Sequence, residues 1–376
     1  EIVNGRKIRV RPKETVSEID KNGYFRRQPN HFTTPFGDGE NDLKAEGNKR
    51  YRLVWAKLCH WSNRAAIVRE LEGLEDQISV NMVEHAPHEK NLGWEYVYNE
   101  NNIDPMLGDQ FLSEAYYRAD DDYHGRTTVP ALIDTTTGKV VNNDYNWLTT
   151  YFEVNFRPWH KKGAPELYPV ELREEIDKMN LWLFDNINNA VYRSSFSRSN
   201  EGHFDGVNTF YAAMDRLEKR LETNRFLFGD YVTDSDIRLY VTLARLDIRY
   251  TAQLGETKRP LYTYKNLWGY AKELWEIPAF AHHTDFAAII RQGRIEGEED
   301  GFRASTHYDL ALPKIDWDAQ WKVSTERAYL SSDPTHPIYL GNNRRFDIDP
   351  TWYDLGAESP KKEEKETPPS CGCCCG

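Results

Sequence analysis

The sequence predicts a mixed α/β domain over residues 51–155 and an all-helical domain over residues 165–295. Short apolar runs typical of strands recur in the first region, whereas in the second apolar residues repeat every three or four positions. Residues 1–50 are rich in charge, Asn, Gly and Pro without sustained periodicity, which indicates an extended arm. Residues 296–376 form a C-terminal extension, and its low-complexity, Cys-rich end is predicted to be disordered. A chain of 376 residues suffices for two domains with such extensions.

Composition and charge narrow the classes of function. Hydrophobic residues make up 39% of the chain and charged residues 29%, which is typical of a globular protein. The net charge of −12 argues against a nucleic-acid-binding surface. No stretch approaches the roughly 18 apolar residues of a membrane span, and the basic N-terminus lacks the apolar core of a secretory signal. We therefore expect a cytoplasmic protein without a nucleic-acid or membrane partner.

The first predicted strand and helix enclose a cysteine. Residues 51–56 are apolar and partly alternating, as in a strand. Cys59 follows, and apolar residues at helical spacing then predict a helix that ends near Gly73. Residues 78–83 predict a second strand, and the polar residues 84–109 predict a long loop or insertion.

The remaining elements complete a known order. Another helix is predicted from Phe111, and two apolar runs at residues 129–133 and 139–141 predict a hairpin. Asn143 and Asp144 are both good helix caps, so a short helix is predicted to begin at one of them. The resulting order β-α-β-α-β-β-α is that of a thioredoxin-like domain.

The second half of the chain contains three amphipathic helical patterns. They extend from Leu172 to Val191, from Val207 to Leu221 and from Ile237 to Ile248. The segment from Thr233 to Asp236 resembles a capping box in which Asp replaces the usual Glu or Gln. Three aromatic residues are expected to anchor the C-terminal extension: Trp317, Trp321 and Tyr339.

Cys59 is a candidate reactive thiol. It is the only cysteine before residue 371, so no disulfide framework is predicted. A cysteine at the start of a helix meets free backbone N–H groups and the positive end of the helix dipole, which both favour the thiolate. Arg64, one turn along, adds positive potential. On these residues alone, an inert buried cysteine at a strand–helix corner is an equal alternative.

Two further features indicate a peptide-like ligand. A cis bond between Val129 and Pro130 would turn the main chain of Val129 outwards, where it can pair with an extended peptide. A trans proline on an edge strand is the alternative. Asp144, next to free amides at a helix start, can hold the α-ammonium and α-carboxylate groups of an amino acid. An ordinary helix cap is the alternative there.

Taken in order, these motifs resemble the glutathionyl-hydroquinone reductases, also called Xi-class glutathione transferases. The matching stretches are Phe25–Pro29, Tyr51–Leu74, Gly93–Trp94, Tyr123–Asn143, Asn189–Tyr192, Tyr231–Leu239 and Asn266–Tyr270. The resemblance implies a thioredoxin-like domain that binds glutathione, followed by an all-helical glutathione-transferase domain. It also implies glutathione as co-substrate, no metal, a small aromatic or thiol-conjugated substrate, and a homodimer.

The resemblance further implies how the chemistry is divided among residues. Cys59 attacks the sulfur of a glutathionyl substrate, and a second glutathione resolves the mixed disulfide that remains. Tyr192 lies beside the substrate and the reactive sulfur. In the glutathione site, Val129 pairs with the peptide backbone and Asp144 holds the γ-glutamyl ammonium. The implied glutathione-binding residues are Trp94, Arg126, Val129, Pro130, Asp144 and Tyr145.

The chain departs from the family pattern at three places. The family's CPWAH motif is replaced by Cys59–Asn63, so His60 takes the place of a rigid proline and either pairs with the thiolate or faces solvent. The family's Glu-Ser pair is Asp144 followed by Tyr145, and no tyrosine stands near Gln292–Arg294, where the family contacts its substrate. We therefore expect the fold to be kept and hydroquinone derivatives to be weaker substrates.

Two other functions stay open at this point. One is a glutathione- or partner-binding protein without reductase activity, and the other is a conjugating transferase whose nucleophile is glutathione's own sulfur. The retained Cys59 favours the reductase. The C-terminal cysteines fit no ordinary zinc pattern, and binding of a soft metal, acceptance of a lipid and absence of a function all stay open for them. These are Cys371, Cys373, Cys374 and Cys375.

Overall fold

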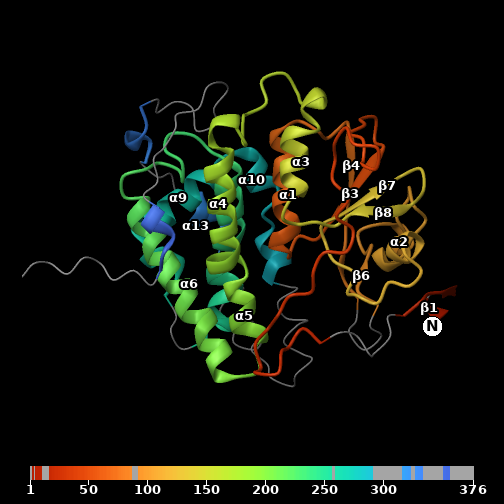
Figure 1. Cartoon of the computed structure of the whole chain (residues 1–376), viewed down its shortest axis with the longest axis horizontal. Helices are drawn as coiled ribbons and strands as arrows, with labels where there is room; N and C mark the ends of the chain where they lie inside the picture. The colour runs from red at the N-terminus through yellow and green to blue at the C-terminus, as the bar shows by residue number, and fades with distance from the viewer. Residues whose placement is uncertain are drawn as a thin grey trace, which may run out of the picture.

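A four-stranded sheet and a helical bundle lie on opposite sides of the molecule, with helices α1 and α3 between them (Figure 1). The helices that join the two parts are α1 (His60–Leu71) and α3 (Leu148–Val154). The computed structural model describes residues 2–3, 5–10, 17–86, 92–255, 259–290, 316–322, 327–332 and 350–355.

The sheet has the strand order β4-β3-β7-β8. Its strands are β3 (Tyr51–Trp55), β4 (Ile78–Met82), β7 (Ala131–Asp134) and β8 (Lys139–Asn142). Strand β3 pairs parallel to β4 and antiparallel to β7, and β8 pairs antiparallel to β7. Together with α1, α2 (Leu112–Ala119) and α3, these strands give the predicted thioredoxin-like order.

Alternation along β3 explains why all of its residues are buried. Leu53 packs in the large core that also contains Val68 of α1 and Phe152 of α3. Its neighbour Val54 faces the other way, into a second core with Tyr116 of α2. Because successive side chains of a strand point to opposite faces, both faces of this central strand need a covering helix.

Two predictions for the α/β part need correction. The helix expected to begin at Asn143 or Asp144 begins at Leu148, because Asp144 first opens a turn in which its carboxylate accepts the Asn146 N–H (3.0 Å). Leu148 N–H then donates to the Asp144 carbonyl. The predicted loop of residues 84–109 contains a small antiparallel hairpin of β5 (Glu84–His85) and β6 (Trp94–Glu95).

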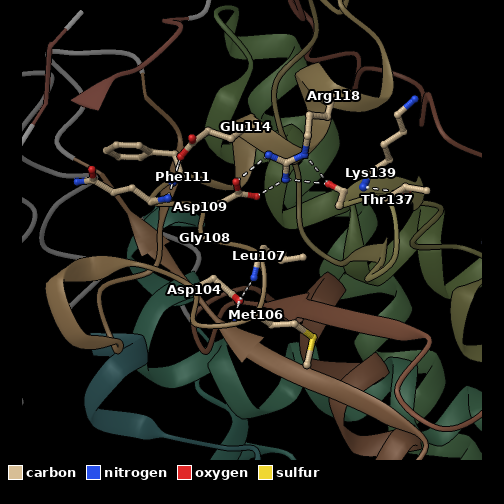
Figure 2. A network of polar contacts seen from close by, with 12 residues as sticks. Asp104, Met106, Leu107, Gly108, Asp109, Phe111, Glu114, Arg118, Thr137 and Lys139 are labelled. Atoms are coloured by element: carbon tan, nitrogen blue, oxygen red, sulfur yellow. Dashed lines mark hydrogen bonds and ion pairs between the residues drawn. The ribbon is translucent and has the colours of Figure 1, made fainter. Parts of the chain in front are cut away.

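Carboxylates hold residues 104–109 of that loop, as Figure 2 shows. One oxygen of Asp104 accepts the N–H groups of Met106 and Leu107 at 2.8 and 2.9 Å, and the other accepts from Arg52 at 2.7 Å. Asp109 is bonded to Arg118, which also donates to a carbonyl in the β7–β8 turn. Buried carboxylates that accept several hydrogen bonds fix loop geometry, so these bonds hold residues 104–109 against β3 and α2.

The helical part follows the predicted patterns with two local changes. The pattern from Leu172 to Val191 is divided by one π-helical turn, and the pattern that ends at Ile248 contains another. The capping box is confirmed, since the Asp236 carboxylate accepts the Thr233 N–H at 2.8 Å. The elements are α4 (Arg173–Leu183), η5 (Phe184–Asn188), α5 (Ala190–Phe196), α6 (Asn200–Arg220), α7 (Asp234–Arg245), η6 (Leu246–Tyr250), α8 (Thr251–Gln253), α9 (Lys265–Trp275) and α10 (Pro278–His282).

The two terminal segments both pack on the body. In the arm, regular structure among the described residues is limited to β1 (Ile2–Val3), β2 (Arg6–Lys7) and isolated bridges, yet Phe25 and Phe36 are buried. In the C-terminal extension, Trp321 of α13 (Trp317–Trp321) is buried as expected, and Trp317 packs against the same core. Tyr339 lies outside the described residues.

A buried acid lies where α3 meets α7. Burial raises the pKa of Glu153 well above its usual value, and the charges of Asp234 and Glu72 raise it further. The folded protein therefore keeps the Glu153 proton to a higher pH than the unfolded chain does. In the unfolded chain, Glu153 loses its proton near pH 4.5. Above that pH, the free energy of unfolding therefore falls as the pH rises, until the pH passes the folded-state pKa of Glu153.

We expect Glu153→Gln to remove this pH dependence while keeping the shape of the side chain. The stability of the variant relative to the wild type should rise by about 1.4 kcal/mol for each pH unit in that interval. Urea unfolding of both proteins between about pH 5 and 8 measures the difference. A difference that stays constant with pH would mean that Glu153 is ionised in the folded protein.

Candidate active site

Cys59 occupies the position that caps the N-terminus of α1. Its backbone is extended (φ −77°, ψ 114°), and its carbonyl accepts the Asn63 N–H at 3.0 Å, the first hydrogen bond of the helix. The first turn of α1 contains no acidic residue. The half-buried thiol therefore lies beside the free N–H groups of a helix start, whose positive potential favours an anion.

The loop that leads into Cys59 is held by a fully buried arginine of α7. Arg245 donates from Nε to the Leu58 carbonyl at 2.6 Å and from Nη2 to the Lys57 carbonyl at 2.7 Å. Burial lowers the pKa of Arg245, and the negative charge of Cys59 opposes that shift. The helical domain thus places a cation next to the thiol and fixes the chain just before it.

The main chain of Val129 lies beside the thiol. The Cys59 Sγ donates to the Val129 carbonyl at 3.6 Å. The bond between Val129 and Pro130 is cis, so of the two alternatives left by the sequence the cis one holds. The predicted nucleophile and the predicted peptide-pairing residue are therefore neighbours in space, although 70 residues separate them in the chain.

His60 is neither a partner of the thiolate nor a solvent-facing residue, so both expectations for it are wrong. Its imidazole is fully buried, and Nδ1 lies 3.0 Å from Thr242 Oγ1 and 3.2 Å from the Tyr250 hydroxyl. Burial lowers the pKa of His60 well below its usual value, and the charge of Arg245 acts in the same direction. His60 is a neutral side chain that joins α1 to α7 and cannot act as a base for Cys59.

Tyr192 of α5 lies within reach of the electrostatic effect of the thiol. Burial is the largest cause that raises the pKa of Tyr192, and the negative charge of Cys59 is the second largest. Its hydroxyl is therefore protonated at neutral pH and can donate a hydrogen bond. Its ring lies 5.9 Å from that of Trp61, which follows Cys59 by two residues.

Residues of the N-terminal arm form hydrogen bonds or ion pairs with both charged residues that are predicted to bind glutathione. Asp144 is buried, and its Oδ1 accepts from Asn30 Nδ2 at 2.9 Å. Arg126 forms a two-point ion pair with Glu18, from Nε at 2.7 Å and from Nη2 at 2.9 Å. The arm thus crosses the region where the sequence predicts the ligand, which local patterns in residues 1–50 did not indicate.

The two predicted aromatic contacts have partners of their own. The ring of Trp94 is stacked on His85 at 3.8 Å, and its indole N–H donates to the Thr127 carbonyl at 3.1 Å. The ring of Tyr145, which replaces a small residue of the family, lies 4.7 Å from Trp61 and is stacked on Phe184. Tyr145 therefore enlarges an aromatic cluster next to Cys59.

Arg27, from the arm, is a site residue that sequence reasoning did not single out. Its guanidinium carbon lies 4.7 Å from the ring centre of Trp61 and 4.6 Å from that of Tyr192. Nε donates to Asn189 Oδ1 at 2.9 Å. A signal was present, because Arg27 belongs to the first stretch that matches the family.

Comparison with known proteins decides the family. Residues 192–273 match the family model described as "Glutathione S-transferase, C-terminal domain". Over 280 residues the chain is 35% identical to glutathione S-transferase omega-like 2 of Schizosaccharomyces pombe, an alignment that covers 72% of this chain and 88% of the relative. The chain belongs to the Xi-class, omega-like glutathione transferases. The resemblance inferred from its motifs is therefore confirmed.

Further relatives of this glutathione transferase agree in sequence and in fold. It is 33% identical to the glutathionyl-hydroquinone reductase YqjG of Escherichia coli, with 64% of this chain and 73% of the relative covered. The crystal structure of the Xi glutathione transferase from Phanerochaete chrysosporium matches with a TM-score of 0.66 and 33% identity, over 72% of this chain and 88% of that one. The predicted fold, a thioredoxin-like domain followed by a helical glutathione-transferase domain, is thus confirmed.

Some predictions about this transferase concern features that the described residues do not include. The segment Gln292–Arg294 and the four C-terminal cysteines both lie outside them. Within the described ranges, no helix is long and apolar enough to span a membrane. In the same ranges, no group of three or more His, Cys, Asp or Glu side chains is placed to hold a metal ion.

Proposed function

We propose that this transferase is a glutathione-dependent reductase that uses Cys59 to remove glutathione from glutathionyl-hydroquinone-like substrates. The observation that carries the proposal is the Cys59 thiol at the start of α1, 3.6 Å from the Val129 carbonyl. The names of the relatives from Escherichia coli and Sphingobium chlorophenolicum, both glutathionyl-hydroquinone reductases, support the substrate class.

The reaction has two thiol exchange steps. In the first, the Cys59 thiolate attacks the sulfur of the glutathionyl group, a Cys59–glutathione disulfide forms, and the bond from that sulfur to the aromatic carbon breaks. The ring carbon gains a proton in place of the sulfur, so the aromatic product carries a hydrogen there. In the second, the thiolate of free glutathione attacks the mixed disulfide, which releases glutathione disulfide and restores the Cys59 thiolate. Two glutathione sulfurs are oxidised, and the aromatic product is reduced by the same two electrons.

Glutathione is proposed to lie along the cis-proline strand, with Val129 pairing with its backbone. Its γ-glutamyl ammonium then meets the Asp144 carboxylate, next to the Tyr145 main chain. The ion pair with Glu18 uses Nε and Nη2 of Arg126, which leaves Nη1 for the glycyl carboxylate. Trp94 supports this loop through its bond to the Thr127 carbonyl.

We expect Asp144→Asn to weaken glutathione binding by about 1.5–3 kcal/mol, because a charged hydrogen bond to the ammonium becomes a neutral one. The amide keeps an oxygen that can accept from Asn30 and from the Asn146 N–H, so the turn itself should be preserved. Titration calorimetry with glutathione measures the change, and thermal unfolding serves as the control. An unchanged affinity would remove Asp144 from the site.

Turnover tests the proposed function as a whole. With glutathione and a glutathionyl-hydroquinone, the wild-type chain should release free hydroquinone and glutathione disulfide in equal amounts. Conjugation of glutathione to an electrophilic aromatic chloride, without this release, would favour the conjugating transferase. Binding of glutathione without either reaction would favour the binding protein. A homodimeric state and a cytoplasmic location stay predictions from the family and the composition.

A further inference from the structure

Arg27 is a cation without an anion of its own. Among the described residues, its Nε has Asn189 as an acceptor, whereas Nη2 is buried with no hydrogen-bond partner and Nη1 has no acceptor either. Glu18, a carboxylate whose charge attracts Arg27, is already bonded to Arg126, and the charge of Arg126 repels Arg27. Arg27 is half-buried, and keeping the buried part of a guanidinium without a counter-charge is costly, so this arrangement favours an anionic ligand.

The aromatic rings around Arg27 offset part of that cost and also suit an aromatic ligand. The rings of Trp61 and Tyr192 both lie within 5 Å of the guanidinium carbon, at a distance typical of cation–π contacts. The ring centre of Tyr145 lies 6.0 Å from the same carbon. A flat, electron-rich ring that carries a negative oxygen would complement both the rings and the free N–H groups.

The arm holds Arg27 in place before any ligand arrives. Phe25 N–H donates to Ser197 Oγ at 3.1 Å, and Arg198 N–H donates to the Gly23 carbonyl at 2.6 Å. Gly23 has a φ of +80°, and a Cβ at this position would lie 2.9 Å from the Cβ of Ser199. The turn before Arg27 is therefore fitted closely to the turn between α5 and α6, which makes the cation preorganised.

Arg27 and the reacting sulfur share a neighbour, Tyr192. The charges of Cys59 and Arg27 both act on the Tyr192 hydroxyl. Residues predicted to hold glutathione, such as Val129 and Asp144, come from the α/β domain, whereas Arg27 faces a helix of the other domain. With the glutathionyl part bound as proposed, we place the aromatic part of the substrate against Tyr192 and Arg27.

We propose that Arg27 binds the ring oxygen that becomes negatively charged when the aromatic product leaves. The inference rests on the proposed function. The substrate reacts as its ketone tautomer, in which the phenol proton has moved to the ring carbon that bears sulfur. The Cys59 thiolate attacks that sulfur, the carbon–sulfur bond breaks, and its electron pair passes through the ring to the ketone oxygen. The resulting phenolate is held by Arg27 and then takes a proton from water.

Two substrates that differ in where the charge develops test this role. The first is a set of glutathionyl-hydroquinones whose ring substituents change the acidity of the phenol. The second is the mixed disulfide of glutathione and 2-mercaptoethanol, whose leaving group carries its charge on sulfur and has no ring oxygen. Arg27→Gln keeps a planar polar side chain and removes the charge, and Arg27→Lys keeps the charge in another shape.

In the full chain, Arg27→Gln should lower kcat/KM for the aromatic substrates by about 100-fold, the usual loss on removing one donor to a developing oxyanion. The loss with the mixed disulfide should be much smaller. The rate of the variant should also depend more steeply on the acidity of the phenol, and Arg27→Lys should recover part of the loss.

Equal losses on both substrates, with an unchanged dependence on acidity, would overturn the proposal and leave Arg27 a structural residue. A variant as active as the wild type on both would also overturn it, while leaving the proposed function intact. A wild-type chain that turns over neither substrate would instead refute the proposed function. If Arg27→Gln does not fold, the same comparison between the two substrates is made with Arg27→Lys.

Discussion

Cys59→Ser is expected to lower the turnover of glutathionyl-hydroquinones by about 10³-fold or more, the scale of losing a covalent nucleophile. A serine hydroxyl stays protonated at neutral pH and cannot form a disulfide with glutathione. The positive potential at the start of α1 cannot compensate for that difference, because it acts on an anion that the hydroxyl does not form. Hydroquinone release, followed by chromatography, measures the loss.

The mixed disulfide gives an independent measurement of the same role. After treatment with glutathione disulfide, mass spectrometry should find one glutathione on Cys59, and none at this position in Cys59→Ser. A variant truncated before Cys371 removes the four C-terminal cysteines, which are otherwise competing sites for the adduct. Full activity of Cys59→Ser, together with no adduct on the truncated protein, would contradict the proposed reductase function and favour a binding protein.

Local chemistry explains what the sequence predicted well. The position of Cys59 follows from a strand, a short connection and a helix, all of which are specified by consecutive residues between 51 and 71. Thr233 and Asp236 form their capping box from neighbouring residues in the same way. The order of elements then fixes the thioredoxin-like arrangement, because a buried sheet of this length needs helices on both faces.

Contacts between distant segments explain what the sequence did not predict. Glu18 meets Arg126 across 108 residues, and Asn30 meets Asp144 across 114. His60 finds its partner Thr242 in a helix 182 residues away. No local sequence pattern indicates such pairs, so His60 was predicted either to pair with the thiolate or to face solvent. The arm was recognised as extended, but its role in placing Arg27 beside Tyr192 depends on three-dimensional packing.

Arg245→Met should destabilise the protein by about 3–5 kcal/mol, the range for removing a buried charged group from its partners. Methionine fills much of the same space but donates no hydrogen bond. The carbonyls of Lys57 and Leu58 and the Asn63 side-chain oxygen would then lose a donor that now lies 2.6 to 3.1 Å away. Urea unfolding measures the loss of stability.

The same variant should react more slowly at Cys59, because the loop before the thiol loses its support and the thiol loses a nearby cation. The rate of alkylation by iodoacetamide, measured on protein truncated before Cys371, reports this effect. Arg198→Met is the matched control, since the Arg198 side chain is exposed and forms no hydrogen bond or ion pair with the described residues. Its stability should change by no more than about 0.5 kcal/mol. If Arg245→Met loses stability while Cys59 is alkylated at the wild-type rate, Arg245 joins the two domains without setting the reactivity of the thiol.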